Sequence, residues 1–269
     1  MQKRIQIALA VLLVMLAGAI TWQVLREREP VYQGKPLRVW LRQYRVTHVE
    51  GDDGELGKQT ETAIRQIGTN AIPIYLGIIA TRESALKLKL LALVPKRWLA
   101  LFPISTVHDF RFLGAYGLMA LGAEGKPAVP VLIALLNDSN PEVRETAVFT
   151  LRSLGPVASD ALPSVIKCVH DHSFSVQYHA IFGLGEIHQE AERVIPILIE
   201  CLNHPPTPRY SVTLGHNAIW SLCQFGAQAK PAVPSLLRLL NDSQASIRSD
   251  VTNALRAIDT EAAVEAGVK

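Results

Sequence analysis

Apolar residues recur along this chain of 269 residues in short runs, and four of the runs open at a proline. Successive prolines of this set are 33, 33 and 38 residues apart. A fixed period of this size is typical of stacked helical hairpins, in which each unit buries its apolar face against its neighbours. The four residues are Pro130, Pro163, Pro196 and Pro234.

Two copies of the unit are nearly identical. Lys126–Pro130 has the same five residues as Lys230–Pro234, and Leu135–Ser139 has the same five as Leu239–Ser243. Both pairs are separated by 104 residues. The chain therefore repeats one structural unit, and arrays of such units form long binding surfaces rather than closed pockets.

Each unit predicts two helices joined by a turn. The first helix begins at or just before the proline, whose missing N–H and fixed φ suit the first turn of a helix. In the unit of Pro130 a turn at Asn137–Pro141 follows. The second helix ends at Gly155, because glycine favours the left-handed conformation of a helix end. Its expected buried stripe is Val143, Ala147, Leu151 and Leu154.

The same register fits five second helices, so the predicted fold is all-α, an α-α superhelix or solenoid of helical hairpins. An incomplete first unit lies upstream of an insertion near residues 80–108, since Gly68 and Gly122 are 54 residues apart instead of 33. The expected parts are a transmembrane or signal segment at 1–29, a juxtamembrane linker at 30–59, the array at 60–259 and a tail at 260–269.

These units resemble HEAT-type repeats, in particular the short bacterial kind found in phycobiliprotein lyases. The resemblance covers roughly residues 60–259. It implies a right-handed superhelix used for protein binding, and it is specific for fold but not for function. The segment Glu29–Leu41 also resembles the juxtamembrane start of membrane-anchored bacterial HEAT proteins.

An uncharged apolar run, Ile5–Leu25, occupies the N-terminus with 21 residues, which is enough to span a bilayer. Trp22 and the charged residues after Leu25 match an interfacial anchor and a boundary. We therefore expect a single uncleaved membrane helix. The alternative is a signal peptide that is cleaved near Ala19, followed by export.

The orientation of that segment is open to two interpretations. A short basic tail before an N-terminal apolar run is typical of export, so we expect an extracytoplasmic array. The arginines that follow the run would instead favour the cytoplasm under the positive-inside rule.

Composition argues against nucleic acid as a partner. The net charge is +3, from 27 basic and 24 acidic residues, which lacks the basic excess of a phosphate-backbone binder. Three cysteines are too few for a disulfide framework. Cys168 and Cys201 occupy equivalent positions in neighbouring units and are interpreted as core hydrophobes.

Aspartate and arginine recur at one spacing, as Asp138 with Arg144 and Asp242 with Arg248. Binding of anions would be one use for these arginines. The interpretation that we favour is structural, because an aspartate that caps a helix or pairs with an arginine of the adjoining unit holds the stack in register.

The sequence contains no arrangement that predicts catalysis or a metal site. His170 and His172 belong to a turn, and His179 lies about two helical turns further on. Glu186, His188 and Glu190 would spread around a helix. No phosphate loop or nucleophile elbow occurs at interpretable spacing. We expect no enzymatic activity, cofactor, metal or small-molecule substrate.

Opposite the buried stripe, at about 100° per residue, each second helix has an outward position that is aromatic in four of the five units. If these helices line the concave side, the aromatic column predicts a groove that binds another protein. The column is Tyr116, Phe149, Phe182, Trp220 and Asn253. The flanking candidates are Phe112, Tyr178, His216, Met119 and Arg152. The alternative is internal cover, by the segment around Val39–Leu41 or by tight curvature.

The insertion contains a second candidate surface, since Lys87–Leu99 mixes cations with leucines and tryptophan. It could lie on a membrane surface. We favour a helix that packs on the first repeat.

The first functional hypothesis is a non-enzymatic, membrane-anchored scaffold that binds a protein along the aromatic concave face. A lyase-like or chaperone subunit that assists cofactor attachment is the alternative that the resemblance permits. A third hypothesis is a structural spacer without a partner on this face.

Overall fold

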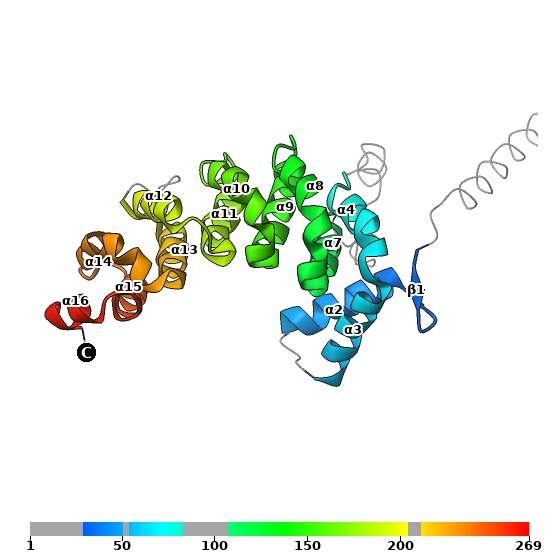
Figure 1. Ribbon diagram of the computed structural model, residues 1–269, viewed down its shortest axis with the longest axis horizontal. Coiled ribbons are helices and arrows are strands. Elements are labelled where there is room, and N and C mark those ends of the chain that lie inside the picture. Colours follow the sequence, from blue (N-terminus) through cyan, green and yellow to red (C-terminus); the bar gives the residue numbers. More distant parts are fainter. Residues whose placement is uncertain (1–28, 51–53, 83–106, 204–210, 269) are drawn as a thin grey trace, which may run out of the picture.

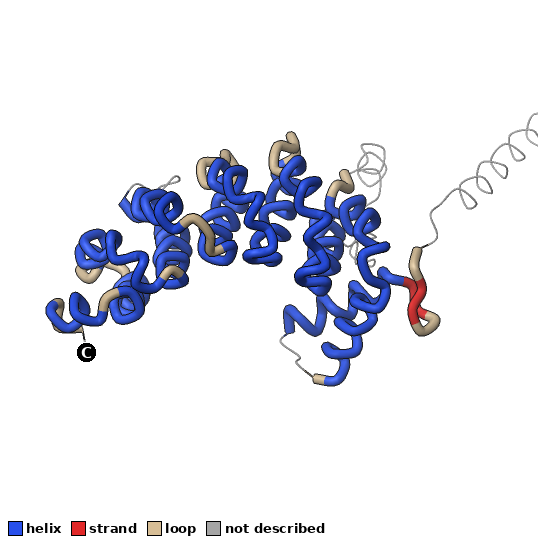
Figure 2. Tube along the Cα trace, in the orientation of Figure 1, coloured by secondary structure: helices blue, strands red, loops and turns tan. Residues whose placement is uncertain are grey.

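The computed structural model describes residues 29–50, 54–82, 107–203 and 211–268, which form a curved stack of helices (Figure 1). The apolar run Ile5–Leu25, most of the insertion and the turn at Pro205–Pro208 lie outside the described residues. The described part begins with a small antiparallel hairpin of β1 (Val31–Tyr32) and β2 (Lys35–Pro36), and the remaining elements are helical (Figure 2).

Helices pair in chain order. At the N-terminal end, α2 (Leu37–Glu50) packs on α3 (Glu55–Ile67), and α3 is followed by α4 (Ile72–Ile79). The hairpins that follow are α4 with α7 (Val107–Leu121), α8 (Val129–Leu135) with α9 (Pro141–Leu154), α10 (Leu162–Cys168) with α11 (Phe174–Ile187), α12 (Ala191–Asn203) with α13 (Ser211–Gln224), and α14 (Val233–Leu239) with α15 (Ala245–Ile258). The short helix α16 (Thr260–Glu265) ends the stack.

The second helices form a continuous layer. Neighbours in this layer contact one another in chain order, α7 with α9, α9 with α11, α11 with α13 and α13 with α15. In Figure 1 these helices follow the inner edge of an arch, whereas α8, α10, α12 and α14 follow its outer edge. The predicted all-α solenoid is confirmed, and the second helices lie on the concave side.

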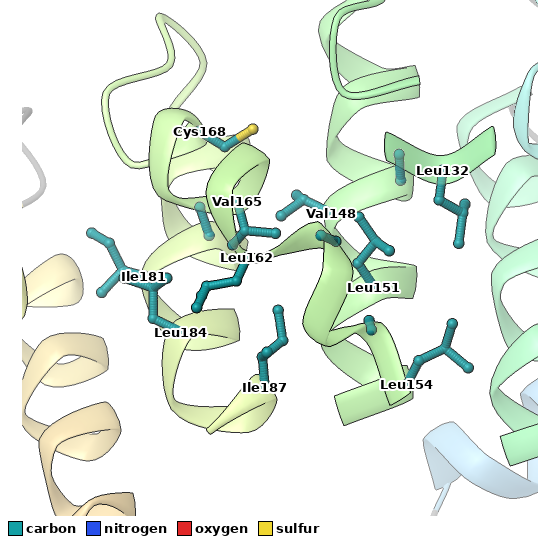
Figure 3. Packing of buried hydrophobic residues seen from close by; sticks show 14 of the residues in the cluster. Leu132, Val148, Leu151, Leu154, Leu162, Val165, Cys168, Ile181, Leu184 and Ile187 are labelled. Carbon is teal, nitrogen blue, oxygen red and sulfur yellow. The ribbon is translucent and has the colours of Figure 1, made fainter. Parts of the chain in front are cut away.

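The core runs through the stack between the two layers. All four residues of the expected stripe in α9 are buried, with Leu154 the most exposed at 5%. Figure 3 shows Leu162 and Val165 of α10 in the space that faces Val148 and Leu151 of α9. Thr146, Val148 and Thr150 of α9 are buried as well, because α7 and α11 cover both sides of this helix. A single periodic stripe therefore underestimates the buried surface of a helix inside a stack.

A short 3-10 segment links most units. Gly122–Ala128, Gly155–Ala161 and Gly226–Ala232 each join a second helix to the next proline-initiated helix. Each segment begins at a glycine with φ between +50° and +57°. Gly155 ends α9 as predicted, but its ψ of −135° lies outside the left-handed helical region. The sequence interpretation did not include these 3-10 segments.

One unit departs from the expected pattern. α12 begins at Ala191, and Pro196 lies inside this helix instead of opening it. Here His188 replaces the glycine at the end of α11, in the left-handed region with φ 50°. The chain then enters a continuous helix rather than a 3-10 segment, so the proline signal marks the start of the helix five residues too late.

Candidate protein-binding face

The outward column of the second helices is a row of aromatic rings. Tyr116 and Phe149 meet edge to face with their centroids 6.0 Å apart. Phe182 and Trp220 stack at 3.9 Å with an interplanar angle of 15°. All four rings are partly exposed, and the last position, Asn253, is exposed. We call these four side chains the aromatic row.

Helix α2 covers one end of this row. In Figure 1 it lies below α7, on the side opposite α8. Tyr44 of α2 meets Tyr116 at 6.5 Å, and His48 meets it at 6.0 Å. Burial raises the pKa of Tyr116. Trp40 and Leu41, the residues that the sequence suggested as cover, are buried, and the Trp40 indole donates to the Tyr32 carbonyl instead. Helix α2 therefore covers Tyr116, the first ring of the row. It does so through Tyr44 and His48, which lie about one and two turns beyond Trp40.

Arg152 fills the gap in the middle of the aromatic row. Its guanidinium carbon lies 5.3 Å from the centroid of Phe149 and 4.4 Å from that of Phe182. Gly183 borders its stem, since a Cβ at this glycine would lie 3.4 Å from the Cβ of Arg152. The row is thus continuous from α7 to α13, as two ring pairs joined by a cation.

The other flanking candidates differ in what they contact. Phe112 meets Phe149 at 4.9 Å, and Tyr178 contacts the ring of His179 at 5.0 Å. His216 pairs with Asp250 of α15. Met119 packs against the core as a partly buried side chain. Gly185, which shares the register position of Met119 and Arg152, is buried between α11 and α13.

His179, considered from the sequence only as a possible metal ligand, belongs to this face. His179 meets the edge of Phe149 at 5.3 Å, and its Nε2 lies 3.9 Å from Oε1 of Glu145. Burial lowers the pKa of His179 to about 3, and the charges of Arg152 and His108 act in the same direction. Burial raises the pKa of Glu145. The imidazole is therefore neutral at physiological pH.

His179 follows a rule that neighbouring units share. Glu145 contacts His179 of the next second helix, Asn217 donates to the Tyr178 carbonyl at 3.1 Å, and His216 contacts Asp250. In each contact, a residue of one second helix meets a residue of the next second helix that lies one position later in the repeat. Comparison of Thr146, His179, Asn217 and Asp250 as one polar column would have identified this signal.

The recurring aspartates lie in the turns between first and second helices, and the recurring arginines lie in the first turn of the second helices. Arg144 makes two hydrogen bonds of 2.7 and 2.8 Å to the carboxylate of Asp171 in the next unit, and it donates to the Asp138 carbonyl at 2.8 Å. Asp138 accepts the Asn140 N–H, which lowers the pKa of Asp138. Arg248 donates to the Asp242 carbonyl at 2.7 Å. These groups bind one another across the turns, at a distance from the aromatic row.

Arg111 has the register position of Arg144 in the preceding unit. It is fully buried, donates to the Thr81 carbonyl at 2.7 Å and pairs with Glu142 of the next second helix. Each of the two arginines binds a backbone carbonyl of its own unit and a carboxylate of the next unit. Together they join three consecutive units.

The described residues contain no group of three or more histidine, cysteine or acidic side chains that could hold a metal ion. Two hollows, of about 360 and 470 Å³, lie elsewhere. The first is lined by residues of α4 and the second by residues of the α12 region, and neither includes the aromatic row.

Within the described ranges, Val107–Leu135 is long and apolar enough to cross a membrane. It comprises α7, the following 3-10 segment and α8, whose buried residues belong to the core of the array.

Comparison with protein families identifies the repeat. Residues 129–214 match the family described as HEAT repeats, and residues 215–242 match the family described as PBS lyase HEAT-like repeat. Residues 129–242 are HEAT-type repeats. The hairpins from α8 to α14 thus have the repeat type that the sequence pattern suggested. None of the curated proteins matches the chain.

Several solved structures are similar to this chain. An engineered protein is 15% identical with a TM-score of 0.51, over 83% of this chain and 96% of that one. A designed armadillo repeat protein in complex with the peptide (KR)4 is 15% identical with a TM-score of 0.46, over 83% and 99%. The complex of CpcE and CpcF of phycocyanin lyase from Nostoc sp. PCC7120 is 20% identical with a TM-score of 0.46, over 89% and 84%. The first of these has a TM-score above 0.5, and at 15% identity its likeness concerns the fold alone.

Proposed function

We propose that this protein is a non-enzymatic scaffold that binds another protein along the concave face of its HEAT-type array. The observation that carries the proposal is the aromatic row, which crosses four second helices and stays partly exposed. Rigid aromatic side chains are preferred anchors in protein interfaces, and each contributes on the order of 2 kcal/mol when a partner desolvates it fully. The row is open along the arch, which suits an extended segment of a partner better than a small molecule.

Membrane attachment is part of the same proposal. The uncharged run Ile5–Leu25 has the length and composition of a membrane helix, and we place the array outside the cytoplasm. A reporter of membrane topology fused at the C-terminus tests this side, and the mass of the mature N-terminus tests cleavage near Ala19. A cytoplasmic signal would reverse the orientation, and a shortened N-terminus would replace the anchor by a signal peptide.

Site-specific crosslinking in the native membrane tests protein binding. A photoreactive residue at Phe182 or Trp220 is expected to capture one defined partner. The same residue at Val131, which is 45% exposed on α8 of the outer edge, is the matched control and should not capture it. Phe149→Ser should reduce the yield at Phe182 by about ten-fold, since the loss of one aromatic anchor corresponds to about 1.4 kcal/mol or more. Crosslinks to copies of this chain alone, or equal capture from both edges, would contradict the proposal.

The family match over residues 215–242 favours one second candidate, a lyase-like or chaperone subunit that assists cofactor attachment. Its test is direct, since the purified chain would bind a bilin or transfer it to an acceptor protein. Bilin binding that depends on the aromatic row would support this candidate over a passive scaffold.

A further inference from the structure

Arg152 lies between two rings of the aromatic row and brings a positive charge to the concave face. Phe149 and Phe182 approach its guanidinium at 5.3 and 4.4 Å. A cation–π contact attracts the charge of a guanidinium and leaves its N–H groups able to donate hydrogen bonds. The aromatic contacts therefore hold Arg152 on this face without giving its donors a hydrogen-bond acceptor.

Other arginines have carboxylate acceptors inside the protein. Arg144 and Arg111 of the second helices bind Asp171 and Glu142, and Arg45 of α2 binds Asp109. Within the described ranges, the guanidinium of Arg152 has no hydrogen bond to an acceptor and no carboxylate within 4.0 Å. Glu186 is near enough to stabilise its charge, but the two make no ion pair. Arg152 thus presents unused donors at a partly buried place, where a charged hydrogen bond is stronger than in water.

The neighbours of Arg152 define what fits beside it. On one side the stacked pair of Phe182 and Trp220 offers a flat apolar surface. On the other side His179 is neutral and Glu145 lies against it. A ligand group at Arg152 is therefore anionic and planar, and the group next to it along the row is apolar or aromatic.

From this charge complementarity we infer that Arg152 binds a carboxylate of the partner protein, from an acidic peptide segment whose neighbouring aromatic or apolar side chain lies on Phe182 and Trp220. The carboxylate accepts two parallel N–H groups of the guanidinium, as in other pairs of arginine with carboxylate. The inference rests on the proposed protein-binding function and adds the chemistry of the segment that is recognised.

Selection from peptide display libraries tests this assignment with the full-length chain in detergent micelles. The probes are three libraries that share an aromatic residue at a fixed position and differ only in the residue set allowed at the next three positions, which is Asp and Glu, Asn and Gln, or Lys and Arg. Wild-type protein is expected to enrich the acidic library about ten-fold over the amide library, the difference that one charge-assisted hydrogen-bonded pair makes. The basic library should be the weakest.

Arg152→Met should abolish the preference for the acidic library while binding through the aromatic position persists. Arg152→Lys should retain part of the preference, because it keeps the charge and loses the planar pair of donors. The matched control is Arg256→Met, at the same register position three units further on and exposed, which should leave the preference unchanged. On wild-type protein, raising salt to about 1 M should weaken the acidic preference through screening, and this measurement does not depend on how any variant folds.

The outcomes separate the two proposals. Enrichment of the aromatic position without preference for acid, or an acidic preference that persists in Arg152→Met, would overturn the assignment of Arg152 and leave the binding face intact. Selection of no peptide by the wild-type chain from any library would overturn both.

Discussion

At the scale of single residues, two neighbouring groups of the concave face respond differently to burial. His179 gives up its charge, with a pKa of about 3, because a neutral imidazole costs less to bury than a charged one. An arginine keeps its proton, so Arg152 lies between two rings that attract a cation. The sequence identified Arg152 through its repeat position. Grouping His179 with His170 and His172 by residue type concealed its place in the polar column.

We predict that His179→Asn makes the protein less sensitive to acid. The folded pKa of His179 lies below the ordinary value of 6.5, so the unfolded chain binds the extra proton, and the stability from the neutral ring is lost as pH falls below 6.5. For one such group the loss at pH 5 is about 2 kcal/mol. Asparagine has no proton to gain, and it occurs at the equivalent Asn217.

Urea unfolding of wild type and His179→Asn at pH 7 and pH 5 gives the loss of unfolding free energy for each. The contributions of the other titrating groups cancel when the two losses are subtracted. An equal loss of stability between the two pH values in wild type and variant would contradict the assignment of a buried neutral histidine.

At the scale of helices, glycines set how closely neighbours approach. A Cβ at Gly185 of α11 would lie 2.7 Å from the Cα of Ser221 in α13, and one at Gly114 of α7 would lie 2.4 Å from the Tyr75 carbonyl oxygen. The sequence predicted that these helices exist and which turns join them. It did not predict the close approach at Gly185, because the pattern within one helix carries no information on how near the next helix lies.

We predict opposite effects for two alanine substitutions in the middle of second helices. Gly185→Ala forces α11 and α13 apart and should cost about 1–3 kcal/mol of unfolding free energy. Gly215→Ala places its Cβ at an ordinary 3.6 Å from Ile247 and should leave stability unchanged or raise it by about 0.5 kcal/mol, since alanine favours helix. Thermal and urea unfolding measure the stability of the two variants. Similar changes in unfolding free energy for Gly185→Ala and Gly215→Ala would contradict the packing argument.

At the scale of the whole molecule, the arch is a linear stack whose units contact their neighbours in chain order. The stability of such an array is close to a sum of unit and interface contributions. The arginines of the turns join adjacent units directly, as Arg144 does with Asp171, whose side chains are only 16% and 12% exposed. Loss of one such contact should therefore weaken a particular interface and the cooperativity of unfolding.

We predict that Arg144→Met destabilises the array by about 3 kcal/mol, because removal of one partner leaves a buried carboxylate without its cation. The control is Arg193→Met in the exposed pair with Glu190, at 50% and 52% exposure, for which we expect a change below about 0.5 kcal/mol. Hydrogen exchange should locate the loss of protection between α9 and α11. Equal effects of the two substitutions would rule out a role of Arg144 in joining the units.

The sequence by itself determined the repeat, its helices, the turns and the residues at equivalent positions, because period, proline and glycine act locally along the chain. Tertiary structure alone decided which of those positions are open. It placed α2 over Tyr116, inserted Arg152 between two rings, and buried His179 and Gly185 between neighbouring helices. These outcomes depend on how closely stacked units approach one another, a distance set by side chains from different repeats and absent from the pattern of any one of them.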